Sequence, residues 1–220
     1  MKMNQPNSAF RVLMAGLVLS VNCLSVNATT VNVSVDTSAL YGSASFMVFD
    51  FLDGDATPDN NVTISNFNFG GGVASLSPPV YSCTSDSTGV ACAGIYGDLN
   101  SAVTMNDQFD FYNEFVGQFS MGSVLSFTLD YSANFAGGTP DSFLFSLLDG
   151  NGNVIPTSDP LGTDTLLNVD LSSLGIIDVS GGTGPNTVAS PVVTAVPEPG
   201  IWVLMFWGML GVSRYCREIV

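Results

Sequence analysis

Alternation of apolar and polar residues, repeated along most of the chain, is the feature that most constrains its fold. Val31, Val33 and Val35 alternate with Asn32 and Ser34, and the same pattern recurs at 125–131 and 143–147. Successive side chains of a β-strand point to opposite faces, so a period of two indicates a strand with one buried face.

Other segments rich in apolar, β-branched or aromatic residues extend this pattern. They are Ser45–Leu52, Val62–Phe69, Phe109–Phe119, Thr165–Leu171 and Val188–Val193. Stretches rich in Gly, Asp, Asn and Pro separate them, as turns do. Eight or nine short strands predict an all-β fold, an antiparallel β-sandwich of jelly-roll type. Only the segment 107–118 allows a short helix as an alternative.

The distribution of charge excludes whole classes of function. The four basic residues are Lys2, Arg11, Arg214 and Arg217, all near the two ends of a chain without histidine. A body with acids and no bases has no His general base, no Lys nucleophile and no basic phosphate clamp. Nucleic acid is excluded as a partner, because binding it requires Lys and Arg against the phosphates. We therefore expect a protein that is not an enzyme.

The N-terminal segment has the pattern of a secretory signal peptide. Lys2 and Arg11 precede an apolar stretch at 12–21, and small residues follow at 26–28. We predict that signal peptidase removes residues 1–28.

The C-terminal segment, 196–220, consists of Val196, Pro197, Glu198 and Pro199, an apolar run at 201–212, and two basic residues, Arg214 and Arg217. Twelve residues of helix span about 18 Å, against about 30 Å of bilayer hydrocarbon, so the run is short for a permanent anchor. A buried core helix is the alternative. The run is apolar on all sides and has basic flanks, which favours a transient transmembrane segment.

These C-terminal features resemble the PEP-CTERM sorting signal of exported bacterial proteins. The resemblance implies a single hydrophobic sorting helix that exosortase, a membrane enzyme, cuts near Pro197-Glu198-Pro199. It also implies export across the inner membrane and delivery to the cell surface or extracellular matrix, in association with exopolysaccharide or biofilm. The strand segments at 62–72, 126–130 and 142–149 resemble an uncharacterised PEP-CTERM subfamily with no known activity. The predicted organisation is a sandwich domain at 29–180, a Gly/Pro/Thr-rich spacer at 181–195 and the sorting tail.

The body contains two cysteines, Cys83 and Cys92, in one polar loop. Export to an oxidising compartment favours a disulfide between them, which in so short a loop stabilises by about 2–3 kcal/mol. A metal or redox pair is the alternative, but it lacks further ligands nearby.

An aspartate cluster offers a candidate calcium site, and no other cofactor is expected. Asp50, Asp53, Asp55 and Asp59 precede Asn60 and Asn61, and their oxygens suit a hard cation. The cluster lacks the full calcium-loop motif, so an ordinary solvated turn is the alternative. Residues 149–153, Asp-Gly-Asn-Gly-Asn, carry similar oxygen ligands, but a hairpin turn explains this segment better.

Three functions therefore compete. The first is a non-enzymatic protein of the envelope or matrix, and the second is a carbohydrate-binding or adhesive module. The third is a secreted hydrolase using two carboxylates, for which no motif selects a pair. For sugar stacking, the candidate aromatic residues are Tyr81, Tyr96, Tyr112 and Tyr131.

Overall fold

Two antiparallel sheets form the body of the protein. The computed structural model describes residues 28–84, 92–135, 137–172, 175–184 and 187–197. The elements in these ranges are β1 (Ala28–Asp36), η1 (Ser38–Leu40), β2 (Ala44–Leu52), β3 (Asn61–Asn68), β4 (Val80–Cys83), β5 (Ile95–Gly97), β6 (Ala102–Asn106), β7 (Tyr112–Ser120), β8 (Val124–Ser132), β9 (Asp141–Asp149), β10 (Leu167–Leu171), β11 (Ile177–Val179) and β12 (Val192–Ala195).

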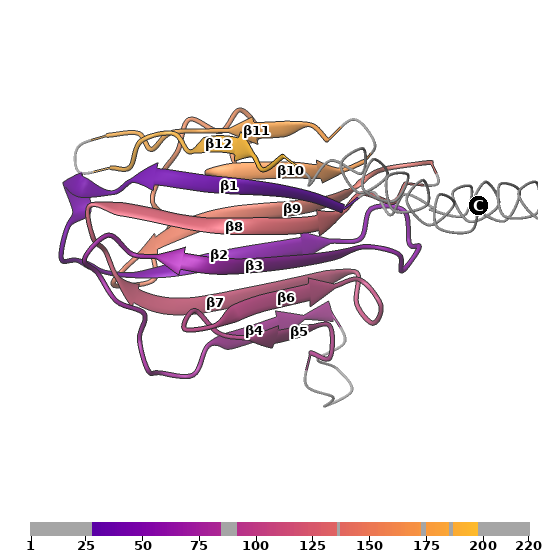
Figure 1. Ribbon diagram of the computed structural model, residues 1–220, viewed down its shortest axis with the longest axis horizontal. Coiled ribbons are helices and arrows are strands. Elements are labelled where there is room, and N and C mark those ends of the chain that lie inside the picture. The colour runs from indigo at the N-terminus through magenta and orange to yellow at the C-terminus, as the bar shows by residue number, and fades with distance from the viewer. Residues whose placement is uncertain (1–27, 85–91, 136, 173–174, 185–186, 198–220) are drawn as a thin grey trace, which may run out of the picture.

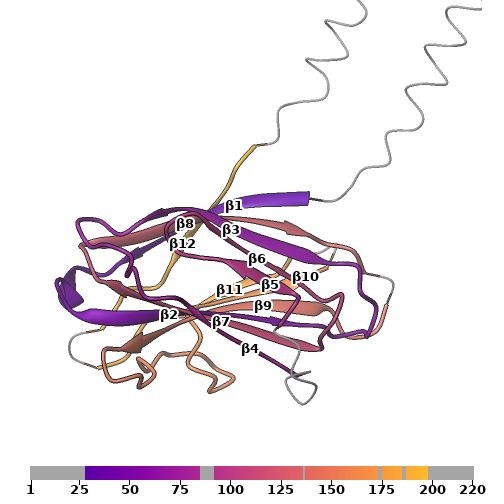
Figure 2. The same ribbon diagram turned by 90° about the horizontal axis from the view of Figure 1, so that it is seen from below.

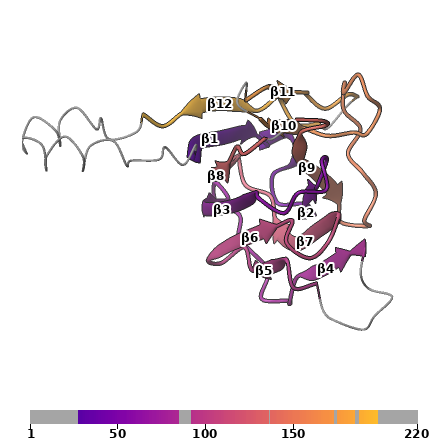
Figure 3. The ribbon, with the colours of Figure 1, turned by 90° about the vertical axis from the view of Figure 1, so that its right-hand side faces the viewer.

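Within these described ranges, each sheet has six strands. Sheet A has the order β12-β1-β8-β3-β6-β5, and sheet B has the order β11-β10-β9-β2-β7-β4. Figure 1 shows the long strands lying side by side across the molecule with their arrows pointing in opposite directions, and Figure 3 shows the two layers end on. The prediction of an all-β antiparallel sandwich is confirmed.

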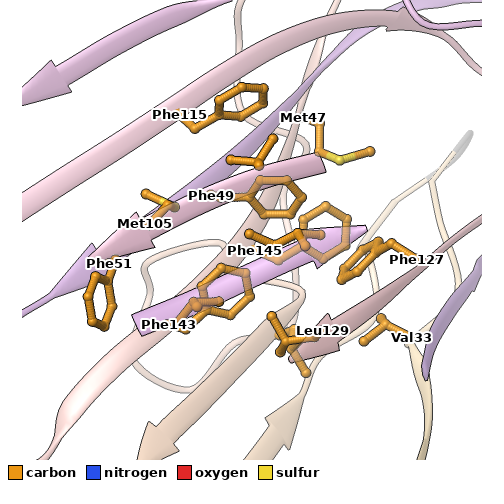
Figure 4. Close-up of a cluster of buried hydrophobic side chains, with 14 of the residues drawn as sticks. Val33, Met47, Phe49, Phe51, Met105, Phe115, Phe127, Leu129, Phe143 and Phe145 are labelled. Atoms are coloured by element: carbon orange, nitrogen blue, oxygen red, sulfur yellow. The ribbon is translucent and has the colours of Figure 1, made fainter. Parts of the chain in front are cut away.

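The apolar residues of the alternating pattern face the core between the sheets, and the polar residues lie on the outer faces. The residues of β7 from Asn113 to Phe119 are alternately buried and half-buried, and those of β8 behave in the same way. Phe49 lies at the centre of the core, with its ring 5.6–5.8 Å from those of Phe115, Phe127, Phe143 and Phe145. Figure 4 shows these side chains packed between the sheets. Ring pairs at this separation add about 0.5–1.5 kcal/mol each to the gain from burial.

The segment 107–118 is not a helix. Residues 107–111 form a loop, and β7 starts at Tyr112, paired with β2 and β4. The strand places Gly117 against the core, where a Cβ would lie 2.7 Å from Leu99 Cδ1. The helical interpretation was wrong because the inward residues, Asn113, Phe115, Gly117 and Phe119, follow a period of two.

The structure has more strands than the sequence predicts. β4, β5, β6 and β11 have three to five residues each and lack the long apolar runs used for prediction. They pair with longer strands, which supply the hydrogen-bonding partners that such short segments need. The predicted spacer, 181–195, contains β12, which pairs with β1.

The two cysteines join the sheets where the chain crosses between them. Cys83 ends β4 in sheet B, and Cys92 lies just before β5 in sheet A. Their sulfur atoms are 2.16 Å apart, at disulfide distance, as the sequence predicts. The bridge therefore ties an edge strand of one sheet to an edge strand of the other.

Candidate functional site

Three loops meet at one end of the sandwich, the right-hand end in Figure 1. They are residues 53–60 after β2, residues 107–111 after β6, and the described residues 133–135 and 137–140 after β8, called the 133–140 loop below. Antiparallel pairing brings the end of each of these strands to the same side, although the loops are far apart in the sequence. Figure 3 looks onto this end.

Four aspartates from the 53–60 and 107–111 loops, together with Asp141 at the start of β9, form an acidic cluster centred on Asp141. Carboxylate oxygens of Asp53, Asp55 and Asp141 lie within 4.8 Å of one another, and so do those of Asp59, Asp107 and Asp141. Asp53, Asp107 and Asp141 are only 8%, 5% and 2% exposed. Burial of so many acidic groups in one place distinguishes this cluster from a simple exposed turn.

Backbone and amide groups hold Asp141 in place. The Gly54 N–H donates to Asp141 Oδ1 at 2.8 Å, and Asn60 Nδ2 donates to Asp141 Oδ2 at 2.8 Å. A Cβ at Gly54 would lie 2.2 Å from the carbonyl oxygen of Pro140, so any other residue would separate the two loops. The contact between the 53–60 and 133–140 loops therefore depends on a glycine at this position.

Asn60 links all three loops. Its Oδ1 accepts hydrogen bonds from Ser132 Oγ and the Asn134 N–H, and its own N–H donates to Asp107 Oδ2 at 2.9 Å. Asp107 Oδ2 also accepts from the Asp59 N–H at 3.2 Å. A single buried amide residue thus fixes the relative positions of the carboxylates.

Burial makes the ionised forms of Asp107 and Asp59 unfavourable. It is the largest cause that raises the pKa of Asp107 to about 6, and the adjacent Asp141 carboxyl raises it as well, while the Asn60 and Asp59 N–H groups lower it. Burial also raises the pKa of Asp59, followed by the charges of Asp55, Asp141 and Asp53. Since the described residues include no Lys, Arg or His, no side-chain cation compensates these charges.

The structure divides the aspartates singled out in the sequence. Asp53 and Asp55 lie in one group and Asp59 in the other, whereas Asp50 belongs to neither. Asp50 lies in β2 and accepts a hydrogen bond from the Tyr112 hydroxyl at 2.9 Å. An all-oxygen set around Asp141 has the ligand type that calcium prefers, and calcium binding stays a prediction.

Sequence reasoning missed Asp107 and Asp141. Asp107 directly follows β6, and Asp141 is the first residue of β9. Their positions at the ends of strands could have marked them as candidate ligands. Local sequence does not reveal the strand order that brings them to the other aspartates. The second segment, 149–153, closes on itself as expected of a turn, with Asp149 Oδ1 accepting from the Asn151 and Asn153 N–H groups.

A surface groove of about 490 Å³ adjoins the acidic cluster. It lies over β3, β5 and β6 of sheet A, and its lining includes Asp59, Asp107, Asn61, Thr104 and Tyr96. The groove and the acidic cluster therefore share two carboxylates.

Of the four tyrosines considered for sugar stacking, only Tyr96 is well exposed, at 58%. Tyr131 is buried, and the hydroxyls of Tyr81 and Tyr112 donate to the Gly97 carbonyl and to Asp50.

The predicted sorting motif falls only partly within the described residues. Val196 donates its N–H to the Thr30 carbonyl at 3.0 Å, and Pro197 ends the last described range. Glu198, Pro199, the apolar run 201–212, Arg214 and Arg217 lie outside the described residues, as does the predicted signal peptide apart from Ala28. Within the described ranges, no helix has the length and apolar character to span a membrane.

Comparison of the chain with protein-family models, curated proteins and solved structures found no match.

Proposed function

We propose that this chain is an exported, non-enzymatic protein of the bacterial envelope or extracellular matrix, delivered through a PEP-CTERM tail. The observation that carries the proposal is the C-terminal segment, with Pro197-Glu198-Pro199, the apolar run 201–212 and the basic residues Arg214 and Arg217. Exosortase would process this tail, and signal peptidase would remove the N-terminal leader. The mature body would remain at the surface or in the matrix with exopolysaccharide.

The positions of β1 and β12 support this proposal. The strands are antiparallel neighbours, with Val31 opposite Ala195, so Ala28 and Pro197 lie at the same end of sheet A. Figure 2 shows β1 beginning and the segment after β12 ending close together. A body with this arrangement can be fully folded while either flanking segment is held in a membrane.

The composition of the body supports a role without catalysis. The described residues lack the Lys, Arg and His side chains on which most acid–base, nucleophilic and phosphate chemistry depends. The buried carboxylates around Asp141 are held by N–H donors from the protein itself. Such an arrangement suits a structural or cation-binding role.

We further propose that the sandwich is a jelly roll. In a jelly roll a long hairpin folds over, so that the first strands pair with the last in nested order. Here β1 pairs with β8, β2 with β7, and β3 with β6. These nested pairs support the proposal, and β9, β10 and β11 then extend sheet B beyond β2.

A carbohydrate-binding module is the second candidate function. The groove beside β5 favours it, because an exposed aromatic ring next to amide and hydroxyl groups is the usual composition of a sugar site.

Mass spectrometry of the intact protein from its native host tests the sorting proposal. We expect the mature, surface-located protein to lack residues 201–220. Replacing Pro197, Glu198 and Pro199 by alanine should leave unprocessed precursor in the inner membrane, whereas alanine at Val192, on the exposed face of β12, should not. An intact C-terminus on surface-located protein would refute the proposal.

A further inference from the structure

A row of side chains on the outer face of sheet A forms part of the groove. Thr63 of β3 is directly opposite Thr104 of β6, and Thr104 is directly opposite Tyr96 of β5. Neighbouring strands are about 4.8 Å apart, so the row extends about 10 Å from Thr63 to Tyr96. It places two hydroxyl groups beside an exposed aromatic ring.

The position of Tyr96 is fixed by a tight hairpin. Ile95, the preceding residue, is only 4% exposed and anchors β5 in the core. Gly97, the following residue, has φ +103° and approaches Ala102 so closely that a Cβ would meet its carbonyl oxygen at 1.9 Å. Tyr96 therefore lies on an edge strand anchored in the core, and the residue is 58% exposed, so that a ligand can reach it.

The end of the groove beside the loops carries amide and carboxylate groups. Asn61 and Asn106 are directly opposite each other on β3 and β6, and Gln108 follows in the next loop. Asp59 and Asp107 line the same end. Planar amides and carboxylates next to an aromatic surface provide donors and acceptors for the hydroxyl and amino groups of a sugar.

The charge of the groove restricts the class of sugar. Asp59 and Asp107 have no cationic side chain to pair with anywhere in the described residues, because these contain no Lys, Arg or His. An anionic glycan would add further like charge, whereas an amino sugar would bring the missing positive charge to the two carboxylates.

We propose that this groove binds a polysaccharide whose units carry free amino groups. One sugar ring stacks on Tyr96, hydroxyl groups bond to Thr63 and Thr104, and an amino group lies against Asp59 and Asp107. This inference rests on the proposed function, in which the exported protein associates with matrix polysaccharide. The groove would be the surface that contacts the polysaccharide.

The test is titration calorimetry on the full-length chain in detergent, with a chelator present so that no divalent cation competes for Asp59 and Asp107. The probes are a hexamer of glucosamine, a hexamer of glucose and an oligogalacturonate. We expect saturable binding of the glucosamine hexamer, weaker binding of the glucose hexamer and none of the oligogalacturonate.

Two variants with matched controls assign the binding to this groove. Tyr96→Ala should weaken binding of the glucosamine hexamer by about tenfold, the loss expected for a stacked aromatic ring. Asp59→Asn, which retains an oxygen acceptor for Asn60, should weaken glucosamine binding and leave glucose binding unchanged. Tyr41→Ala and Asp178→Asn, at exposed positions outside the groove, should change neither.

Three results would overturn the proposal: no saturable binding of the glucosamine hexamer, a preference for oligogalacturonate, or unchanged affinity in both groove variants. Tail processing is measured separately on the same variants and should be normal. If the C-terminal tail is removed normally but the protein does not bind the glucosamine hexamer, only the proposal for the groove is refuted. If the protein binds the glucosamine hexamer but keeps its C-terminal tail in the native host, only the sorting proposal is refuted.

Discussion

Replacing Asp50 by asparagine should stabilise the protein at alkaline pH. Asp50 is half-buried in β2, and its direct cross-strand neighbour in β7 is another acid, Glu114. Burial is the main reason that its pKa rises from 3.8 to about 6; the Tyr112 hydroxyl lowers it, and the charge of Glu114 raises it. Like charges directly opposite each other destabilise a sheet, so the ionised form of Asp50 is unfavourable.

The size of the effect follows from the pKa shift. A rise from 3.8 to about 6 corresponds to about 3 kcal/mol, at 1.36 kcal/mol per pKa unit. Water that reaches the half-buried side chain screens part of this, so about 1–3 kcal/mol is expected. The stabilising contribution of the neutral acid is complete below pH 3.8. It is lost as the pH rises through 6, because in this window only the folded state holds the proton.

Urea unfolding of wild type and Asp50→Asn at several pH values measures this contribution. Asparagine is neutral at every pH and can still accept from the Tyr112 hydroxyl, so the variant should be more stable by about 1–3 kcal/mol at pH 8. The gain should disappear near pH 4. Asp178→Asn, at an exposed position in β11, serves as the control and should show no gain of this kind.

Two results would contradict this reasoning. A variant that is less stable than wild type at pH 8 would mean that the carboxylate is needed in its ionised form. A gain of the same size at pH 4 and pH 8 would mean that the substitution acts through packing and not through charge.

Two further predictions concern the disulfide and the acidic cluster. Peptide mapping without reductant should recover Cys83 and Cys92 as a linked pair from exported protein, and two free thiols in the wild type would disprove the bridge. Replacing both cysteines by serine should lower the free energy of unfolding by about 2–3 kcal/mol. Millimolar calcium should raise the free energy of unfolding by about 1.4 kcal/mol at ten times the Kd, and so raise the melting temperature more than sodium chloride of matched ionic strength does. Asp53→Asn with Asp55→Asn, or Asp141→Asn alone, should abolish that excess. An equal response to the two salts in all variants would leave only charge screening.

Local sequence predicted the long strands because their signal is local. In β8, each residue from Leu125 to Tyr131 shows by its polarity which face it occupies, so seven consecutive residues repeat the signal. The three residues of β5 or β11 are too few for such a pattern. Those strands exist because a longer neighbour satisfies their hydrogen bonds, which is a property of the whole sheet.

In the candidate site, too, local sequence indicates some of the residues and the arrangement of the sheets determines the others. Proximity in the sequence groups Asp50 with Asp53, Asp55 and Asp59. The strand alternation turns Asp50 onto the outer face of β2, where Tyr112 contacts it. Asp141, which is 2% exposed and central to the cluster, is the first residue of β9.

Composition and periodicity by themselves determined that the body is an acidic, all-β domain without a basic side chain, because both are read residue by residue. Tertiary structure alone decided which acids meet, since antiparallel strand order brings Asp53 and Asp107 from two separate loops together with Asp141 at the start of β9. It also decided that Tyr96, among the candidate tyrosines, faces solvent beside Asp59 and Asp107. Contacts of this range depend on how the sheets pair, and no local pattern of residues encodes that pairing.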